Sequence, residues 1–198
     1  MGAAERREQI LACAVRHFEQ RSYNEVSTAE IAKDAGVGRP LIHHYFGTKR
    51  ELYLEVVRRL SFVPSYVPAA AVKGIPLDSL EARIEASIDR WLTVAWRHRS
   101  MWISTITMDG AGRDKEVDRI LQQADEIAAD RMLEALGLVA SPDYSRLRVM
   151  TLAYGGLAKA ASRQWLVHEA LTRAEIHALL SKTMLTIVRD VAPAFSDH

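Results

Sequence analysis

The residue types best suited to chemistry gather in one short stretch, RPLIHHYFGTK, from Arg39 to Lys49. An arginine such as Arg39 can donate a bidentate pair of hydrogen bonds to guanine, and a proline such as Pro40 can contact a thymine methyl group. Histidine, tyrosine and lysine side chains can reach the phosphates of a nucleic-acid backbone. These residues predict a nucleic-acid-binding surface, provided that one helix presents them together.

The flanking residues supply the elements that would hold such a helix. Ser27–Glu30 has the spacing of a capping box that starts a short helix. Gly36 can end that helix in a left-handed conformation, and Pro40 is tolerated in the first turn of the next one. A second capping box, Thr48–Glu51, opens a further helix. The pattern is that of a helix-turn-helix, whose second helix enters the major groove. An ordinary helical hairpin in an all-α domain has the same spacing, so spacing alone leaves both open.

The segment from Ser27 to Leu52, with IAKDAGV, HHYF and GTKREL in order, resembles the DNA-binding domain of the TetR (tetracycline repressor) family of bacterial transcription regulators. The resemblance covers roughly residues 5 to 58. It implies a homodimer whose subunits each have an N-terminal three-helix DNA-binding domain and a larger helical ligand domain.

Position by position, the resemblance implies contacts with double-stranded operator DNA. It makes Ser27 the helix cap, Thr28 and Lys49 phosphate contacts, and one face of the second helix the base-reading surface: Arg39, Pro40, Leu41, His43, His44 and Tyr45. Two positions depart from the family pattern. The family usually has Tyr where this chain has His43, and Ser or another polar residue where it has Gly38.

The amino-acid composition limits the classes of protein to which the chain can belong. The 198 residues include 26 basic and 25 acidic side chains, so no global field favours nucleic acid. Residues 1–60 hold ten Lys and Arg against eight Asp and Glu, so contacts with DNA must come from local placement. No signal peptide and no apolar run long enough to cross a membrane is present, and the single Cys13 excludes an internal disulfide or a cysteine metal cluster. We therefore expect a soluble cytoplasmic protein with no membrane partner and no cofactor, and Cys13 as a buried apolar group.

Helical periodicity runs through the chain, and no stretch alternates with period two, so the fold class is all-α with about nine helices. A Pro-rich stretch from Phe62 to Pro76 marks a junction. The predicted domains are a helix-turn-helix domain over 1–60, a junction over 61–77 and an effector-binding and dimerisation domain over 78–198. Helices are expected at 4–20, 28–35, 39–46, 49–60, 78–99, 100–112, 114–136, 141–168 and 172–191, the last with a Thr172–Glu175 capping box.

The last two helices carry apolar residues on more than one side, which indicates a partner. In the family, these helices from two subunits form a four-helix interface. The candidate dimer residues are Gly156, Ala160, Val167, Leu180, Met184 and Ile187.

Aromatic and aliphatic side chains of the larger domain could line a ligand cavity, since ligand sites are mostly apolar. The candidates are Trp91, Trp96, Trp102, Ile103, Ile106, Met108, Met132, Tyr154 and Trp165. For any single one of them, plain core packing is the favoured explanation. The resemblance implies a small hydrophobic or amphipathic effector.

These features favour a DNA-binding transcriptional regulator, a homodimeric repressor released from a palindromic operator by a small hydrophobic effector. The alternative is a helical adaptor that binds protein without DNA. An enzyme is disfavoured because the adjacent His43 and His44 diverge by about 100° on a helix and share no metal-binding face. The chain also has no Gly-x-Ser-x-Gly elbow and no phosphate-cradling glycine loop.

Overall fold

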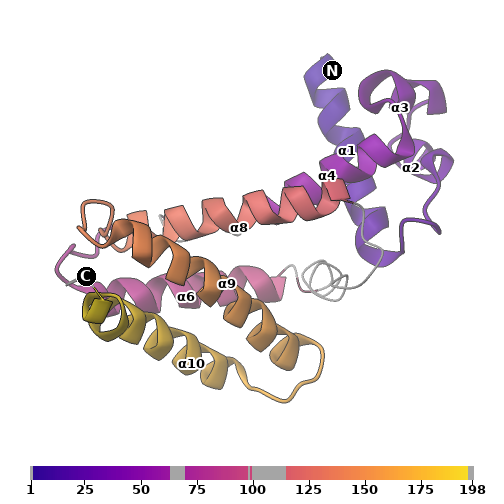
Figure 1. Ribbon diagram of the computed structural model, residues 1–198. Coiled ribbons are helices and arrows are strands. Elements are labelled where there is room, and N and C mark those ends of the chain that lie inside the picture. The colour runs from indigo at the N-terminus through magenta and orange to yellow at the C-terminus, as the bar shows by residue number, and fades with distance from the viewer. Residues whose placement is uncertain (1, 63–69, 98, 100–114, 196–198) are drawn as a thin grey trace. The chain divides into compact units, whose positions relative to one another are not determined.

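A computed structural model describes residues 2–62, 70–97, 99 and 115–195 (Figure 1). These residues are helical and include no strand, which confirms the all-α prediction. Residues 63–69 of the junction and the short helix expected at 100–112 lie outside the described residues. Eight α-helices are described: α1 (Ala3–Gln20), α2 (Thr28–Asp34), α3 (Arg39–Phe46), α4 (Lys49–Phe62), α6 (Leu80–Arg97), α8 (Lys115–Ala135), α9 (Tyr144–Leu166) and α10 (Arg173–Thr186).

All three predicted capping boxes form. At the start of α2, the Glu30 N–H donates to Ser27 Oγ at 3.2 Å, and the Ser27 N–H donates to the Glu30 carboxylate at 3.1 Å. Thr48–Glu51 at α4 and Thr172–Glu175 at α10 make the same reciprocal pair. Each box satisfies two N–H groups that a helix start otherwise leaves without partners.

Several helix ends differ from the sequence-based expectation. α4 ends at Phe62, two residues later than expected, and α9 begins at Tyr144, three residues later. α6 begins after Ser79, whose carbonyl oxygen accepts from the Arg83 N–H at 3.0 Å, two residues after the expected start at 78. α10 ends at Thr186 and continues as a π turn, Ile187–Val191, which hydrophobic periodicity did not reveal. A π turn adds a residue to the helical repeat and rotates the side chains that follow it.

The chain folds into two compact units. The N-terminal unit comprises Met1–Ser61 with Gly112–Ile120, and the C-terminal unit comprises Phe62–Ala111 with Leu121–His198. The start of α8 therefore groups with the N-terminal unit, where Glu116 lies 3.5 Å from Arg58 of α4. None of the described helices combines the length and apolar character needed to cross a membrane.

The core of the N-terminal unit is built from one apolar face of each of its first four helices. Burying an isoleucine or leucine side chain contributes about 1.5–3 kcal/mol, so a core of this size can hold four short helices together. As expected, Cys13 is part of this core. The buried residues are Ile10, Leu11, Cys13, Ala14, Phe18, Val26, Ile31, Ala32, Ala35, Ile42, Phe46, Leu52 and Val56.

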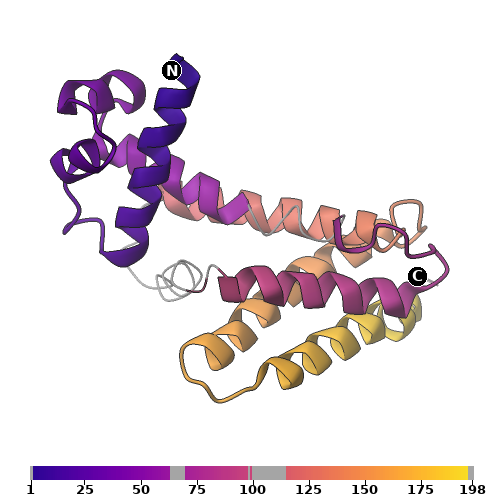
Figure 2. The same cartoon turned by 180° about the vertical axis from the view of Figure 1, so that it is seen from behind.

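In the C-terminal unit, α10 packs against both α6 and α9 (Figure 2). α6 and α10 are antiparallel, because Arg173 at the start of α10 contacts Asp89 at 2.8 Å while His177 reaches the carbonyl of Glu85 at 3.3 Å. The main core between the helices contains Ile84, Ile88, Leu92, Ala95, Met132, Leu136, Tyr154, Ala158, Ala161, Trp165, Ile176, Leu180 and Met184.

Two glycines of the N-terminal unit have backbone angles that other residues rarely adopt. Gly36 follows α2 with φ of 62°, and Gly47 follows α3 with φ of 72°. A Cβ atom at Gly36 would have no heavy atom within 4 Å, whereas a Cβ at Gly47 would lie 2.2 Å from a carboxylate oxygen of Glu51. A positive φ thus disfavours a residue with a Cβ at both sites, and a steric conflict is added only at Gly47.

We expect Gly36→Ala to lower the free energy of unfolding by about 1 kcal/mol, the cost of left-handed backbone for a residue with a Cβ. Gly47→Ala should cost more, about 2–3 kcal/mol, because Glu51 must also leave its cap. Urea unfolding of both variants followed by circular dichroism measures the difference. Equal losses would contradict the steric argument.

Candidate nucleic-acid interface

α2 and α3 form the helix-turn-helix of the N-terminal unit. After α2, the left-handed Gly36 reverses the chain, and the Val37 N–H donates to the carbonyl oxygen of Ala32 at 2.9 Å. Pro40 lies in the first turn of α3, where its missing N–H costs nothing. The buried side chains of Ile42 and Phe46 then anchor α3 to the core of the unit.

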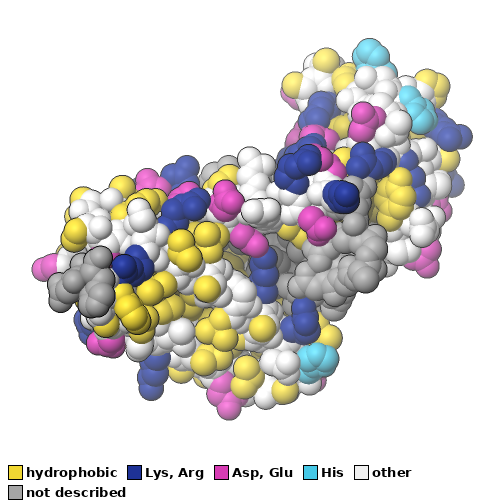
Figure 3. All heavy atoms as spheres, viewed as in Figure 1, with side chains coloured by type: hydrophobic (Ala, Val, Ile, Leu, Met, Phe, Trp, Pro, Cys, Tyr) yellow, Lys and Arg dark blue, Asp and Glu magenta, His cyan; other side chains and the backbone are white. Residues whose placement is uncertain are grey.

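The opposite side of α3 faces solvent. Arg39, Pro40, His43 and His44 are exposed, and histidine side chains are visible at the surface where α3 lies (Figure 3). Leu41 and Tyr45, also expected on the base-reading face, are half-buried against the core instead. The structure therefore brings four of the six expected α3 residues fully to the surface.

A reciprocal pair of hydrogen bonds closes the turn after α3. The Gly47 N–H donates to the His43 carbonyl oxygen at 2.9 Å, and the His43 ring Nδ1 lies 2.8 Å from the Gly47 carbonyl oxygen. We call these two contacts the His43–Gly47 clasp. Sequence reasoning did not find the clasp, and the glycine that directly follows HHYF was the available signal.

Lys49, the expected phosphate contact at the start of α4, rests on an aromatic ring. Its Nζ lies 4.4 Å from the centroid of the Tyr23 ring, and Tyr23 in turn packs edge-on against Tyr53 at 5.0 Å. A cation over an aromatic face is held there electrostatically. The ammonium keeps N–H groups on the side away from the ring. Tyr23 is also packed against the core of the unit, and the sequence analysis did not predict its contact with Lys49.

The two residues expected at the start of α2 differ in access. The Ser27 hydroxyl accepts the Glu30 N–H as the cap of α2. The Thr28 residue is only 6% exposed, which leaves its side chain little surface for a phosphate. Their roles in DNA binding remain predictions.

Most acidic groups of the N-terminal unit are occupied within the unit. The Arg59 guanidinium lies 2.7 Å from Glu8 and lowers the pKa of that carboxyl group. The Arg7 guanidinium, 2.8 Å from Glu55, does the same for Glu55. Arg39, by contrast, has no hydrogen-bond or ion-pair partner among the described residues, so its guanidinium is available to a ligand.

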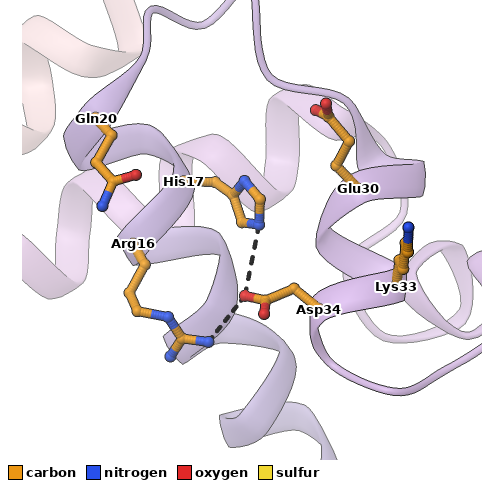
Figure 4. Close-up of a pocket in the computed structure, with 6 residues that line it drawn as sticks. All are labelled: Arg16, His17, Gln20, Glu30, Lys33 and Asp34. Atoms are coloured by element: carbon orange, nitrogen blue, oxygen red, sulfur yellow. Dashed lines mark hydrogen bonds and ion pairs between the residues drawn. The ribbon is translucent and has the colours of Figure 1, made fainter.

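A hollow on the surface of the N-terminal unit lies between α1 and α2 (Figure 4). Asp34 is the hub of its polar lining, because its carboxylate lies 2.8 Å from Arg16 and 3.5 Å from His17. Glu30 on the same wall pairs with Arg21 at 3.2 Å. Because these side chains are paired with one another, we interpret the hollow as part of the contact between the two helices.

The candidate ligand-lining residues fall into three groups. Met132, Tyr154 and Trp165 are buried in the main core of the C-terminal unit, with Trp91 packed against it. Trp96 is 51% exposed and stacks on Trp165 with ring centroids 5.6 Å apart. The remaining candidates lie outside the described residues: Trp102, Ile103, Ile106 and Met108.

The candidate dimer residues also fall into an exposed group and a buried group. Gly156, Ala160 and Val167 of α9 are exposed, and Ile187 is half-buried. Leu180 and Met184 are 1% and 0% exposed inside the core of their own unit, so they are not on the free face of α10. Further exposed apolar residues lie on α9 and α10, namely Val149, Ala153, Leu157 and Leu179. Figure 3 shows hydrophobic side chains at many points on the surface of the C-terminal unit.

The capped helix pair and the exposed face of α3 define a helix-turn-helix transcription regulator. Residues 10–56 match the model of the bacterial regulatory proteins of the tetR family. This match confirms the sequence resemblance to the TetR-family transcriptional regulators. The matched family and the structural neighbours are transcription regulators rather than enzymes.

Two named relatives cover different parts of the chain. The HTH-type transcriptional activator FasR of Mycolicibacterium smegmatis is 25% identical over 162 residues, which is 82% of this chain and 73% of FasR. The HTH-type transcriptional regulator BetI of Brucella anthropi is 44% identical over 55 residues, but these are only 28% of either chain. The likeness to BetI is therefore confined to a short segment.

Solved structures share the fold. A tetR-family transcriptional regulator from Streptomyces coelicolor has a TM-score of 0.78 and 26% identity, covering 98% of this chain and 85% of its own. The transcriptional regulator FadR of Bacillus subtilis, solved in complex with stearoyl-CoA, has a TM-score of 0.65 and 15% identity over 92% of this chain and 97% of its own. The second likeness shows the fold alone.

Proposed function

We propose that this regulator is a homodimeric repressor that binds a palindromic operator and is released by a small hydrophobic effector. The observation that carries the DNA-binding part is the division of α3 into two faces. Ile42 and Phe46 anchor the helix, while Arg39, Pro40 and His43 are exposed. A helix held in this way can present its first turns to base edges in the major groove.

Arg39 and Lys49 should have different tasks in the complex. Arg39 lies in the first turn of α3 without a partner among the described residues, and its fork of donors suits guanine O6 and N7. Lys49 lies at the first residue of α4, beside the positive end of the helix dipole, where a phosphate would gain from both. Arg39 should therefore determine the sequence preference, and Lys49 should determine the overall affinity.

We expect Arg39→Ala to weaken binding to the operator at least roughly tenfold while affinity for scrambled duplex changes little, because a base contact is lost. Lys49→Ala should weaken both equally and reduce the slope of log affinity against log salt by about one per subunit, because a counterion is no longer released. Fluorescence anisotropy over a salt series, on duplex from upstream of the protein's own gene, measures both.

The matched control is Arg90→Ala, which removes an exposed cation from α6 of the C-terminal unit and should leave both affinities unchanged. If wild type binds duplex DNA from upstream of its gene no more tightly than scrambled DNA, the result would contradict the proposal that it binds an operator in that region. The alternative, an adaptor that binds protein through its apolar faces, would then be favoured.

The exposed face of α9 supports the homodimer. Val149, Ala153, Gly156, Leu157 and Ala160 recur at spacings of three and four, so they line one side of the helix, and all are exposed. An apolar stripe of this length on the surface indicates a covered interface. Its small residues allow a second helix to approach closely. A two-fold dimer also fits a palindromic operator, whose half-sites are one helical turn apart.

We expect Ala160→Glu to convert the dimer to a monomer, because it buries a carboxylate against the apolar stripe of the partner. Light scattering coupled to size exclusion should then give the mass of one chain, and operator affinity should fall with it. Ala82→Glu, an exposed alanine on α6, is the control and should stay dimeric. A monomeric wild type would contradict the proposal outright.

The effector proposal is supported by the C-terminal unit and by its relatives. The core around Tyr154 and Trp165 is apolar and aromatic, and the Tyr154 hydroxyl donates to the Leu180 carbonyl oxygen at 3.2 Å. Burial raises the pKa of Tyr154, so this hydroxyl stays protonated and can act as a donor. FadR of Bacillus subtilis holds stearoyl-CoA, which makes a long-chain acyl thioester the first effector class to test.

Stearoyl-CoA should raise the midpoint of thermal unfolding and release the protein from its operator, since a ligand that binds only the native state stabilises it by about 2.7 kcal/mol at a hundredfold excess over Kd. Free coenzyme A and stearate are the controls and should do less. An equal response to coenzyme A would exclude recognition of the acyl chain. Tighter operator binding with the ligand would point to activation, the role in the name of FasR.

A further inference from the structure

His43 has one ring nitrogen already in use. Its Nδ1 lies 2.8 Å from the Gly47 carbonyl oxygen, and the Gly47 N–H returns a hydrogen bond of 2.9 Å to the His43 carbonyl oxygen. A carbonyl oxygen can only accept a hydrogen bond, so Nδ1 must carry a hydrogen in the clasp. This holds for both the neutral and the charged form of the ring.

The other nitrogen, Nε2, is therefore the only ring atom left for a ligand, and its chemistry depends on charge. In the neutral ring with hydrogen on Nδ1, Nε2 has a lone pair and can only accept. In the imidazolium, Nε2 carries a hydrogen and donates. A DNA phosphate oxygen also only accepts, so the neutral ring offers it no hydrogen bond.

We propose that His43 binds the operator backbone only as an imidazolium, so that DNA binding takes up a proton at this residue in each subunit. This inference rests on the proposed function. The proton comes from solvent, adds to Nε2, and places a positive charge beside the phosphate. His43 is exposed, so both the proton and the phosphate can reach it.

Among the described residues of α2, α3 and the first turn of α4, no free carboxylate is available to this imidazolium. On α3 the other charged or titratable residues are Arg39, His44 and Tyr45. On the first turn of α4 they are Lys49, Arg50 and Glu51, and the Glu51 carboxylate is committed to the Thr48 N–H at 2.7 Å.

α2, which packs against α3, adds no free carboxylate among its described residues. Its charged groups are Glu30, Lys33 and Asp34, and the two acids pair with Arg21 and Arg16 of α1. The anion that favours the charged ring must therefore come from DNA. Because the bound state holds the proton more tightly than the free state, operator affinity rises as pH falls and is lost as pH rises.

The test compares operator affinity at about pH 6 and about pH 8, the range in which an ordinary histidine changes charge, at constant ionic strength. Wild type should bind at least roughly tenfold more weakly at the higher pH, because each dimer loses two charge-assisted hydrogen bonds. His43→Tyr should bind equally at both, because a phenol hydroxyl donates at either pH. His44→Gln is the control for the neighbouring imidazole and should keep the wild-type dependence.

Each outcome has one meaning. A His43→Tyr variant that keeps the wild-type pH dependence would overturn the proposal, as would a wild type whose affinity is the same at both values. The latter would mean that DNA binding takes up no proton at His43. Loss of operator binding by wild type at both values would instead be a failure of the proposed function.

A second measurement needs no DNA. Two-bond proton–nitrogen spectra of the free full-length protein, labelled with ¹⁵N-histidine at about pH 8, distinguish the two neutral tautomers. The resonance that disappears in His43→Tyr should show hydrogen on Nδ1. Hydrogen on Nε2 would overturn the proposal whatever the protein binds.

Discussion

The turn between α3 and α4 is the constraint on which the interface depends. Gly47 alone can take its backbone angles there, and the same residue closes the clasp with His43. One residue further on, Thr48 starts α4 through its capping box and thereby places Lys49 over the ring of Tyr23. A few residues thus fix where an imidazole and an ammonium group lie, and neither position is set by burial of its own side chain.

In the N-terminal unit, the placement of the charged side chains matters more than the small difference between the numbers of basic and acidic groups. Arg7, Arg16 and Arg59 neutralise carboxylates on neighbouring helices, and these exposed pairs contribute little to stability individually. Their effect is local. They neutralise carboxylates that lie away from α3, while Arg39 on α3 has no partner among the described residues. A nearly balanced composition therefore conceals a surface suited to an anion, because only placement distinguishes a paired arginine from a free one.

Local rules explain most of what the sequence predicted. The three capping boxes and the helix stop at Gly36 are instructions carried by residues three or four apart, so they could be identified without a structure. The clasp and the contact between Lys49 and Tyr23 were missed for different reasons. The clasp depends on a ring orientation, and Tyr23 lies far from Lys49 in sequence. Leu180 and Met184 were assigned to a dimer face because α10 is apolar on several sides, and periodicity cannot say which side meets the core of its own subunit. The π turn at Ile187–Val191 had no sequence signal at all.

The two faces of α3 also bear on how such a protein can diverge. Ile42 and Phe46 hold the helix in place, and the caps on either side are independent of the side chains that point to solvent. If α3 reads the operator as proposed, substitutions at Arg39, Pro40 or His44 should change the preferred binding sequence with little cost in folding. His43 is the exception, because one ring both belongs to the turn and faces outward. After gene duplication, a daughter protein can acquire a new operator by exchanging the first set freely, whereas a change at His43 alters the shape of the turn at the same time.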